Sequence, residues 1–474
     1  MKMSIPSRRL FLKKTGIISS GFIGLQAYVS ACGSSGDRDT TRIDALLHEG
    51  YGPLLDDPEG IVNLPVGFTY KIISRQGDQM ADGLLVPGSA DGMAAFQGPD
   101  GKVIVVRNHE VTPSDLKGGA FGEDLSLLNL LKPESFFDFG RGKRPCMGGT
   151  TTFIYNPQTQ EVELEYLSLA GTIRNCAGGA TPWNSWITCE EDVTRADDSL
   201  EKDHGYNFEV PAQTTPKLFD PVPLKAMGRF RHEAVCVHPE NGIVYQTEDK
   251  GDGLIYRFIP DQKGNLHAGR LQVLALKGLP SFDTRNWQEL ESKVMEIGKK
   301  YIVEWQDIEG IDSPEDDLRI RGFDNGAARF ARGEGMWYGD DEFYFACTNG
   351  GKKQLGQIFR YITSPMEGQP VESDQPATLE IFIEPNNANL VQSADNLTVS
   401  AHGDLVICED LPTPRIVGVT PEGQIYHIAK NVGYKSEFAG ACFSPDGQTL
   451  FVNIQGPGLT LVINGPWADR NRKV

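Results

Sequence analysis

Acidic side chains recur in this chain beside short apolar runs, at the places where strands would begin or end. The acids at such ends are Glu190, Glu191, Glu233, Glu248, Asp249, Glu334, Asp395, Glu409 and Asp410. If the strands are arranged radially, their ends meet around one axis, so carboxylates distant in sequence come together. A single acid at a strand end can instead accept backbone N–H bonds in a turn. The whole set would repel itself without cations, and it therefore predicts a metal centre.

Cys176 adds a softer ligand to this set. It stands in the segment from Arg174 to Glu191, whose glycines predict a loop around the cysteine. A thiolate near carboxylates needs a cation to stabilise it, and sulfur among hard oxygen ligands favours a transition metal beside hard-ion sites. Two alternatives remain open, a disulfide with Cys146 and a free reactive thiol. Seven cysteines follow Cys32, and because this number is odd, at least one of them is unpaired.

Arg332 stands two residues before Glu334, so it would project from the same short segment as a metal ligand. A guanidinium group there can bind two phosphate oxygens at once. The alternative is a structural salt bridge within the acidic rim. The segment Arg107–Glu110 also closes a strand, and we expect it to orient its neighbours rather than to bind metal.

The elements that would position these residues are short β-rich runs, which recur from about Asp57 onward between Gly, Pro, Asn and Asp turns. Residues 242–249 with 253–258 and residues 342–349 with 356–361 repeat one plan. In each pair an apolar strand ends in small or acidic residues, a loop follows, and an aromatic strand returns. Radial repetition explains this pattern better than a sandwich of two sheets. The chain is therefore predicted to be all-β, a β-propeller with irregular loop insertions.

The clearest helical pattern covers residues 286–300, where Trp287, Leu290, Val294 and Ile297 would share one face. This pattern predicts a small helical insertion. No polar low-complexity linker divides the rest of the chain. Residues 57–474 are therefore expected to form a single catalytic propeller domain.

The N-terminal residues 1–31 have the layout of a twin-arginine export signal, with Arg8 and Arg9 before a mildly apolar run. That run is too short and too rich in Gly and Ser for a membrane anchor. The small residues before Cys32 resemble a lipoprotein lipobox, the alternative being ordinary cleavage near by, and residues 32–56 would then form a tether. We expect export to the periplasm, with membrane attachment only through a lipid on Cys32.

The chain is acidic, with a formal net charge of -19. Residues 1–31 contain five basic residues and no acids, so their removal gives -19 - 5 = -24. A polyanionic nucleic acid would be repelled by this charge and is excluded as a partner. The charge suits an exported protein that collects cations.

Several segments together resemble the PhoX family of bacterial alkaline phosphatases. The segments, in the order of the family, are residues 175–183 with 189–191, Arg231–Glu233, residues 247–253, Arg332–Gly335, Asp395–Leu397, Cys408–Glu409 and residues 437–447. The resemblance covers most of the chain after residue 31. It implies a propeller whose centre holds a pair of ferric ions and several calcium ions, with a bridging oxo group available to attack phosphorus.

Residue by residue, the resemblance implies that Cys176, Glu233 and Glu334 are iron ligands. It implies that Glu191, Asp395 and Glu409 are calcium or bridging ligands, and that Arg332 binds phosphate. The sequence departs from the longer family members in two ways. It lacks the asparagine that contacts phosphate near residues 148–153 and a lysine from the C-terminal part of the site, so the phosphate-binding set is expected to be reduced.

The function predicted from these features is an exported, metal-dependent and monomeric alkaline phosphatase that acts on small phosphomonoesters. A calcium-dependent propeller lactonase or phosphotriesterase is the alternative enzyme, because it would share the carboxylate rim. It would have no use for thiolate-bound iron. A non-catalytic propeller that binds a partner through its rim loops is a third class.

Overall fold

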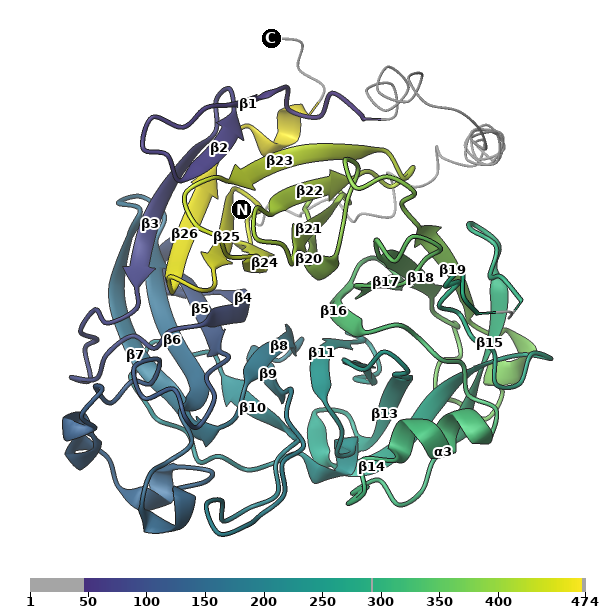
Figure 1. Ribbon diagram of the computed structural model, residues 1–474, viewed down its shortest axis with the longest axis horizontal. Helices are drawn as coiled ribbons and strands as arrows, with labels where there is room; N and C mark the ends of the chain where they lie inside the picture. Colours follow the sequence, from purple (N-terminus) through teal and green to yellow (C-terminus); the bar gives the residue numbers. More distant parts are fainter. Residues whose placement is uncertain (1–46, 291–292, 471–474) are drawn as a thin grey trace, which may run out of the picture. The chain divides into compact units, whose positions relative to one another are not determined.

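The computed structural model describes residues 47–290 and 293–470. The predicted signal peptide (residues 1–31), Cys32 and the first part of the predicted tether lie outside these residues. Strands dominate the described part of the chain and are arranged in blades around a common axis (Figure 1). None of its helices has the length and hydropathy needed to cross a membrane.

Six strands lie innermost and contact one another in a closed ring. In ring order they are β4 (Ala90–Gln97), β8 (Asn175–Ala180), β11 (His232–Val237), β16 (Gly333–Tyr338), β20 (Ala394–Val399) and β24 (Phe438–Phe443). Each of them begins an antiparallel blade that extends outward (Figure 1). The predicted all-β propeller is therefore confirmed, and it has six blades.

The outer strands complete the blades in chain order. Behind β4 lie β5 (Val103–His109), β6 (Gly148–Asn156) and β7 (Glu161–Thr172). Behind β8 lie β9 (Ser185–Glu190) and β10 (Asn207–Pro211). Behind β11 lie β12 (Val244–Glu248), β13 (Ile255–Gln262) and β14 (Asn265–Leu276). Behind β16 lie β17 (Glu342–Cys347), β18 (Gln357–Ile362) and β19 (Thr378–Ile383). Behind β20 lie β21 (Leu405–Glu409), β22 (Arg415–Val419) and β23 (Ile425–Asn431). Behind β24 lie β25 (Thr449–Ile454) and β26 (Leu459–Asn464). Strand β15 (Tyr301–Asp307) joins β14 to β19, so two blades form one nine-stranded sheet.

The ring is closed by strands from both ends of the described chain. Strand β3 (Thr69–Arg75) pairs with β26 and so completes the last blade. Strands β1 (Leu54–Leu55) and β2 (Val62–Pro65) extend the blade that starts at β20. Tyr51 is buried against Trp467. Residues 47–56, which the sequence assigns to the tether, therefore pack on the propeller.

The predicted helix at residues 286–300 does not form in the described parts of this range, residues 286–290 and 293–300. The only α-helix in the described residues is α3 (Leu318–Asp324). Asn286 has a left-handed φ of 56°, and its side chain bonds the backbone N–H (2.7 Å) and carbonyl (2.9 Å) of Met295. A side chain that closes a loop in this way competes with helical hydrogen bonds. The apolar spacing reflects loop contacts, such as the bond from Trp287 Nε1 to the carbonyl of Asn349.

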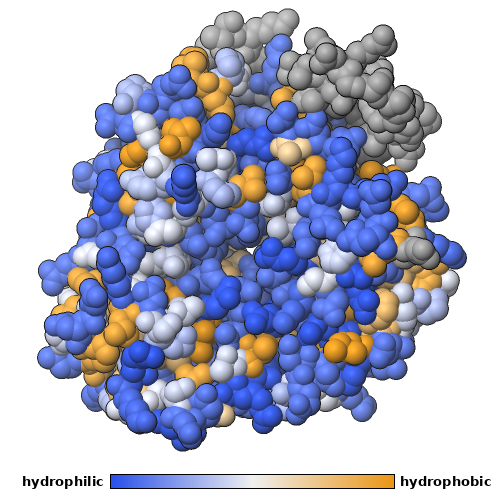
Figure 2. Space-filling view, viewed as in Figure 1, coloured by the Kyte–Doolittle hydropathy of each residue, from blue (hydrophilic) through white to orange (hydrophobic). Residues whose placement is uncertain are grey.

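Short 3₁₀ turns account for the remaining helical residues. They are Pro99–Gly101, Ser126–Leu130, Pro133–Ser135, Gly140–Gly142, Lys225–Met227, Glu372–Asp374 and Trp467–Asp469. The apolar core lies between neighbouring blades. For example, Tyr245 of β12 packs on Phe343 of β17, with ring centroids 4.3 Å apart. The middle of one face of the molecule is lined mainly by hydrophilic residues (Figure 2).

Candidate metal and phosphate site

Every innermost strand is interrupted by a β-bulge at the same point near its start. Pairing with the next strand shifts between Ala90 and Met93, Asn175 and Gly178, His232 and Val235, Gly333 and Met336, Ala394 and Leu397, and Ala439 and Cys442. The first bulge residues are Asp91, Cys176, Glu233, Glu334, Asp395 and Gly440. Because a bulge re-aims a side chain, five blades present a carboxylate or thiol at equivalent positions.

The residue after four of these five side chains is glycine or alanine, and only Asp395 is followed by a larger residue, Asn396. The small residues are needed because the innermost strands approach one another closely at the axis. A Cβ atom on Gly335 would lie 2.6 Å from the carbonyl oxygen of Asp395. A Cβ atom on Gly92 would lie 2.6 Å from the Cα of Ala177. An acid followed by glycine or alanine at the start of an apolar strand is therefore the sequence signature of three of these positions. Asp91 matches it, although this residue is not among the ligands predicted from the sequence.

The ligand atoms form three overlapping groups. The groups are Cys176 with Glu191 and Glu233, Glu233 with Glu334 and Asp395, and Asp395 with Asp410 and Glu437, and within each group the atoms lie within 4.8 Å of one another. Glu233 and Asp395 are shared between groups. The structure thus brings five of the predicted ligands together. Cys176 lies in strand β8 rather than in the predicted loop, because its glycines serve close packing between strands.

In three blades, two consecutive acids stand at the end of the second strand: Glu190 and Glu191, Glu248 and Asp249, and Glu409 and Asp410. The two side chains of each pair point in opposite directions. The first acid of each pair bonds to the surrounding blade, whereas Glu191, Asp249 and Asp410 face the centre. Glu409, a predicted calcium ligand, is fully buried and accepts hydrogen bonds from Arg415 Nε (2.8 Å) and the backbone of Gln392 (2.8 Å). The structure therefore does not bring Glu409 into the ligand groups. Asp410 lies there instead, since side chains alternate along a strand.

Three arginines occupy another equivalent position, two residues before the bulge residue: Arg174, Arg231 and Arg332. Arg332 has a left-handed φ of 50°, and its carbonyl accepts a bond from Thr348 N–H (3.1 Å). Its Nε and Nη2 donate to Asp249 (2.8 and 3.1 Å), and Nη2 also donates to Glu334 (2.7 Å). Within residues 47–290 and 293–470, its Nη1 makes no hydrogen bond. With its side chain 34% exposed, Arg332 can offer this free edge to an anion beside the ligands.

Glu110 connects the acidic centre with the remaining rim. Arg174 Nε donates to Glu110 (2.9 Å), and the same guanidinium pairs with Glu191. Gln455 Nε2 bridges Glu110 (2.9 Å) and Asp91 (2.8 Å). These contacts place Glu110 where it can orient ligand residues of two blades.

Comparison with known proteins decides what kind of enzyme carries this centre. A sequence profile described as "Alkaline phosphatase PhoX" matches residues 49–133 and 141–458, most of the chain. The chain belongs to the PhoX family. It is therefore a phosphoric monoester hydrolase of the alkaline phosphatase type, and the predicted family is confirmed. Membership favours the phosphatase over the lactonase and the non-catalytic propeller.

The PhoX fold of this chain is shared by one solved structure with a TM-score above 0.5. The structure of Pseudomonas fluorescens PhoX in complex with vanadate, a transition state analogue, matches with a TM-score of 0.61 and 18% identity, covering 89% of this chain and 98% of that one. A gluconolactonase from Xanthomonas campestris matches with a TM-score of 0.40 and 9% identity, covering 84% of this chain and 98% of that one. No curated protein matches the chain in sequence.

The electrostatics of the PhoX centre fit bound cations. Burial, followed by neighbouring carboxylates, raises the pKa of Asp395 to about 7 and that of Glu437 to about 10. Burial also raises the pKa of Glu191 to about 8 although Arg174 opposes the shift. The pKa of the Cys176 thiol is raised by burial and then by Glu233 and Glu191. Cations would stabilise the ionised forms of all these groups, so this donor set fits the family's dependence on metal ions.

A first prediction concerns the stability of the chelated protein. Because these folded-state pKa values lie above those of an unfolded chain, the stabilisation is present at low pH and is lost as pH rises through about 7 and about 8. We expect the melting temperature in EDTA to fall between pH 5 and pH 9. Added calcium should raise it more at pH 9 than at pH 5. A melting temperature in EDTA that stays constant or rises over this interval would contradict the prediction.

Proposed function

We propose that this chain hydrolyses small phosphomonoesters at a mixed iron and calcium centre. In this proposal Cys176, Glu233 and Glu334 hold two ferric ions, and Glu191 and Asp395 serve calcium or bridge the metals. The observation that carries the proposal is the row of three ligand groups joined by Glu233 and Asp395, with a thiol at one end. Sulfur with carboxylates favours a transition metal.

The other end of the row offers only oxygen ligands, which suit calcium. Asp410 and Glu437 lie there beside Asp395. We therefore assign these two residues to calcium in place of Glu409, whose carboxylate is neutralised by Arg415. Asp91, which lies near Asp395 and Glu110 and is buried, is a further oxygen ligand on the same side.

The protein's own contribution to the reaction is to bind and orient the phosphate ester. When bound, the ions would polarise the phosphoryl oxygens and offset the charge of the transition state. Asp249 holds the guanidinium of Arg332 through two hydrogen bonds (2.8 and 3.1 Å), so that Nη1 is left for a phosphoryl oxygen. A pre-oriented donor of this kind loses little energy in reorganisation when charge develops on the substrate.

Metal analysis of a cysteine variant tests this assignment. We expect purified wild-type protein to contain iron and calcium, and Cys176→Ser to lose most of the iron and most of the activity while keeping calcium. Cys442→Ser is the matched control, because Cys442 is a fully buried thiol of an innermost strand outside the ligand groups. It should keep both metals.

Two results would overturn the iron assignment. One is active wild-type protein that contains calcium and no iron. The other is Cys176→Ser protein that retains iron at the wild-type ratio. Folded, metal-replete protein that fails to hydrolyse any phosphomonoester in a broad panel would contradict the proposed substrate class.

A further inference from the structure

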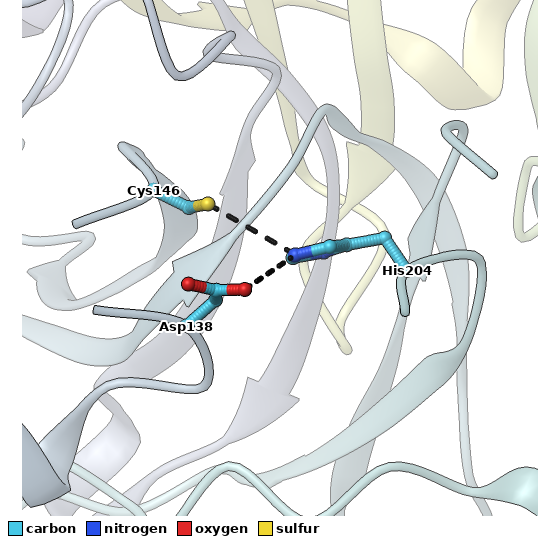
Figure 3. A group of neighbouring side chains, drawn as sticks. All are labelled: Asp138, Cys146 and His204. Carbon is cyan, nitrogen blue, oxygen red and sulfur yellow. Dashed lines mark hydrogen bonds and ion pairs between the residues drawn. The ribbon is translucent and has the colours of Figure 1, made fainter. Parts of the chain in front are cut away.

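A second group of potential ligands lies outside the acidic centre. It consists of Asp138, Cys146 and His204, whose side chains are fully buried and point toward one another (Figure 3). Asp138 and Cys146 belong to the long insertion between β5 and β6, and His204 belongs to the connection between β9 and β10. Two segments that are distant in sequence therefore contribute the three residues.

The hydrogen bond that His204 Nδ1 makes with Glu190 determines which ring nitrogen is available to bind a metal ion. His204 Nδ1 lies 2.7 Å from Glu190 Oε1, and this carboxylate also accepts bonds from the backbone N–H groups of Ile173 (2.9 Å) and Gly205 (2.9 Å). Since Glu190 only accepts, Nδ1 carries the hydrogen. A metal-binding histidine commonly donates its second ring N–H to a carboxylate in this way. Nε2 is the nitrogen that faces Asp138 and Cys146.

The distances around Nε2 suit metal ligands better than hydrogen-bonding partners. Nε2 lies 3.4 Å from Asp138 Oδ2 and 4.0 Å from Cys146 Sγ. A charge-assisted hydrogen bond is normally about 2.7–2.9 Å long. In a tetrahedral zinc site, with bonds of about 2.0–2.3 Å, neighbouring ligand atoms lie about 3.3–3.7 Å apart. The nitrogen–oxygen distance matches this value, and the nitrogen–sulfur distance exceeds it by a few tenths of an ångström.

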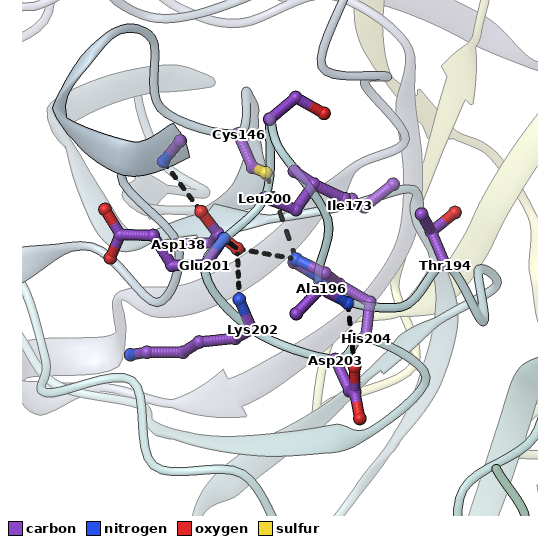
Figure 4. Close-up of polar contacts among 12 residues, drawn as sticks. Asp138, Cys146, Ile173, Thr194, Ala196, Leu200, Glu201, Lys202, Asp203 and His204 are labelled. Carbon is purple, nitrogen blue, oxygen red and sulfur yellow. Dashed lines mark hydrogen bonds and ion pairs between the residues drawn. The ribbon is translucent and has the colours of Figure 1, made fainter.

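The surroundings keep the other two ligands in place. The backbone N–H of Gly140 donates to Asp138 (2.7 Å). The backbone N–H groups of Glu201 (2.8 Å) and Lys202 (2.9 Å) also donate to it (Figure 4), and these bonds favour its ionised form. Cys146 packs with Ile173 and Leu200, which are apolar. Imidazole nitrogen, carboxylate oxygen and thiolate sulfur are all donors that zinc takes, and three protein ligands leave the fourth tetrahedral position to a non-protein donor such as water.

We propose that Asp138, Cys146 and His204 bind a structural zinc-type divalent cation, with Glu190 orienting the histidine. The ion would fasten the insertion between β5 and β6 of one blade to the connection between β9 and β10 of the next blade. Glu190 adjoins Glu191, and Ile173 adjoins Arg174, so this ion would support the segments that carry the rim residues. Its charge would offset the thiolate and the carboxylate in the buried pocket.

The competing occupant of the pocket is a proton. Without a cation, the carboxylates of Glu190 and Asp138, opposed by burial, raise the pKa of His204 to about 12. The histidine would then be an imidazolium paired with Asp138, beside a neutral thiol. The two states differ in the bond to sulfur, because only a metal ion makes Cys146 a thiolate ligand.

Cobalt spectroscopy of the full chain distinguishes the two states. Cys176→Ser removes the other candidate thiolate, and this protein is stripped with a chelator and reloaded with Co²⁺. We expect a near-ultraviolet thiolate-to-cobalt charge-transfer band, which is lost when Cys146→Ser is added. Cys442→Ser, added instead, should leave the band intact. Zinc content after reloading with Zn²⁺ should fall by about one ion per chain with Cys146→Ser.

The same experiment can overturn the proposal. Reloaded Cys176→Ser protein without a charge-transfer band, or with a band that survives Cys146→Ser, would show that the pocket is protonated rather than metallated. If Cys146→Ser fails to fold by circular dichroism, Asp138→Asn serves as the second variant, since its amide oxygen can still accept backbone bonds. This variant is expected to shift the band and weaken cobalt binding by at least about tenfold, and an unchanged band and affinity would count against the site.

Discussion

Glu233→Gln is expected to reduce phosphomonoester hydrolysis by at least about 10³-fold, which exceeds the 10–100-fold effect typical of a residue that only orients a metal ligand. Glu233 is shared by the group that contains Cys176 and the group that contains Glu334. An amide in its place keeps the size of the side chain but removes a negative charge. Both neighbouring ions would lose a ligand, so we expect a loss of iron as well as of kcat. Activity and metal content of the same preparation provide the measurement.

Glu248→Gln is the matched control for this substitution. Glu248 is a buried carboxylate of the same blade, and it accepts bonds from Tyr256 Oη (2.8 Å) and the backbone of Leu254 (3.2 Å) rather than facing the centre. We expect its activity to stay within about tenfold of wild type. Equal losses in the two variants would mean that Glu233 acts through folding. A Glu233→Gln protein with wild-type kcat and iron would contradict its role as a shared ligand.

The sequence allowed the radial fold and most of the centre to be predicted, because both depend on local signals. Strand-length apolar runs that end in acids predict the blades, and the ring of blades then brings Cys176, Glu233 and Glu334 together. Asp91 also carries the signal, an acid followed by glycine before an apolar strand. This signal cannot be interpreted from the sequence alone, since its cause, the close approach of the innermost strands, is visible only in the ring.

Side-chain direction could not be predicted with the same success. Glu409 and Asp410 are both acidic and are neighbours at the end of β21, but the alternation of side chains directs only Asp410 to the centre. The glycines around Cys176 indicate a loop in sequence, although they serve strand packing. The apolar spacing of residues 286–300 imitates a helix, and the bond that prevents one, from Asn286 to Met295, depends on tertiary structure.

Arg332→Ala is expected to lower kcat/KM by about 10²–10³-fold, the loss typical of removing one pre-oriented donor from a transition state. Asp249 and Glu334 remain in this variant, so the iron and calcium content should be unchanged. Inhibition by inorganic phosphate should weaken in parallel, because the same Nη1 edge would bind the product. A purely structural arginine would change stability without changing this inhibition.

Arg332→Lys separates the charge of this side chain from its geometry. An ammonium group keeps the charge but cannot hold Asp249 through two bonds while donating to phosphate, so we expect only partial recovery relative to Arg332→Ala. Arg321→Ala is the control, because it removes an ion pair between Arg321 of α3 and Asp317 (2.9 Å), and α3 lies on the outside of the ring of blades (Figure 1). It should leave kcat/KM unchanged. Full activity in Arg332→Lys would show that charge alone suffices, and unaltered phosphate inhibition in Arg332→Ala would refute the phosphate contact.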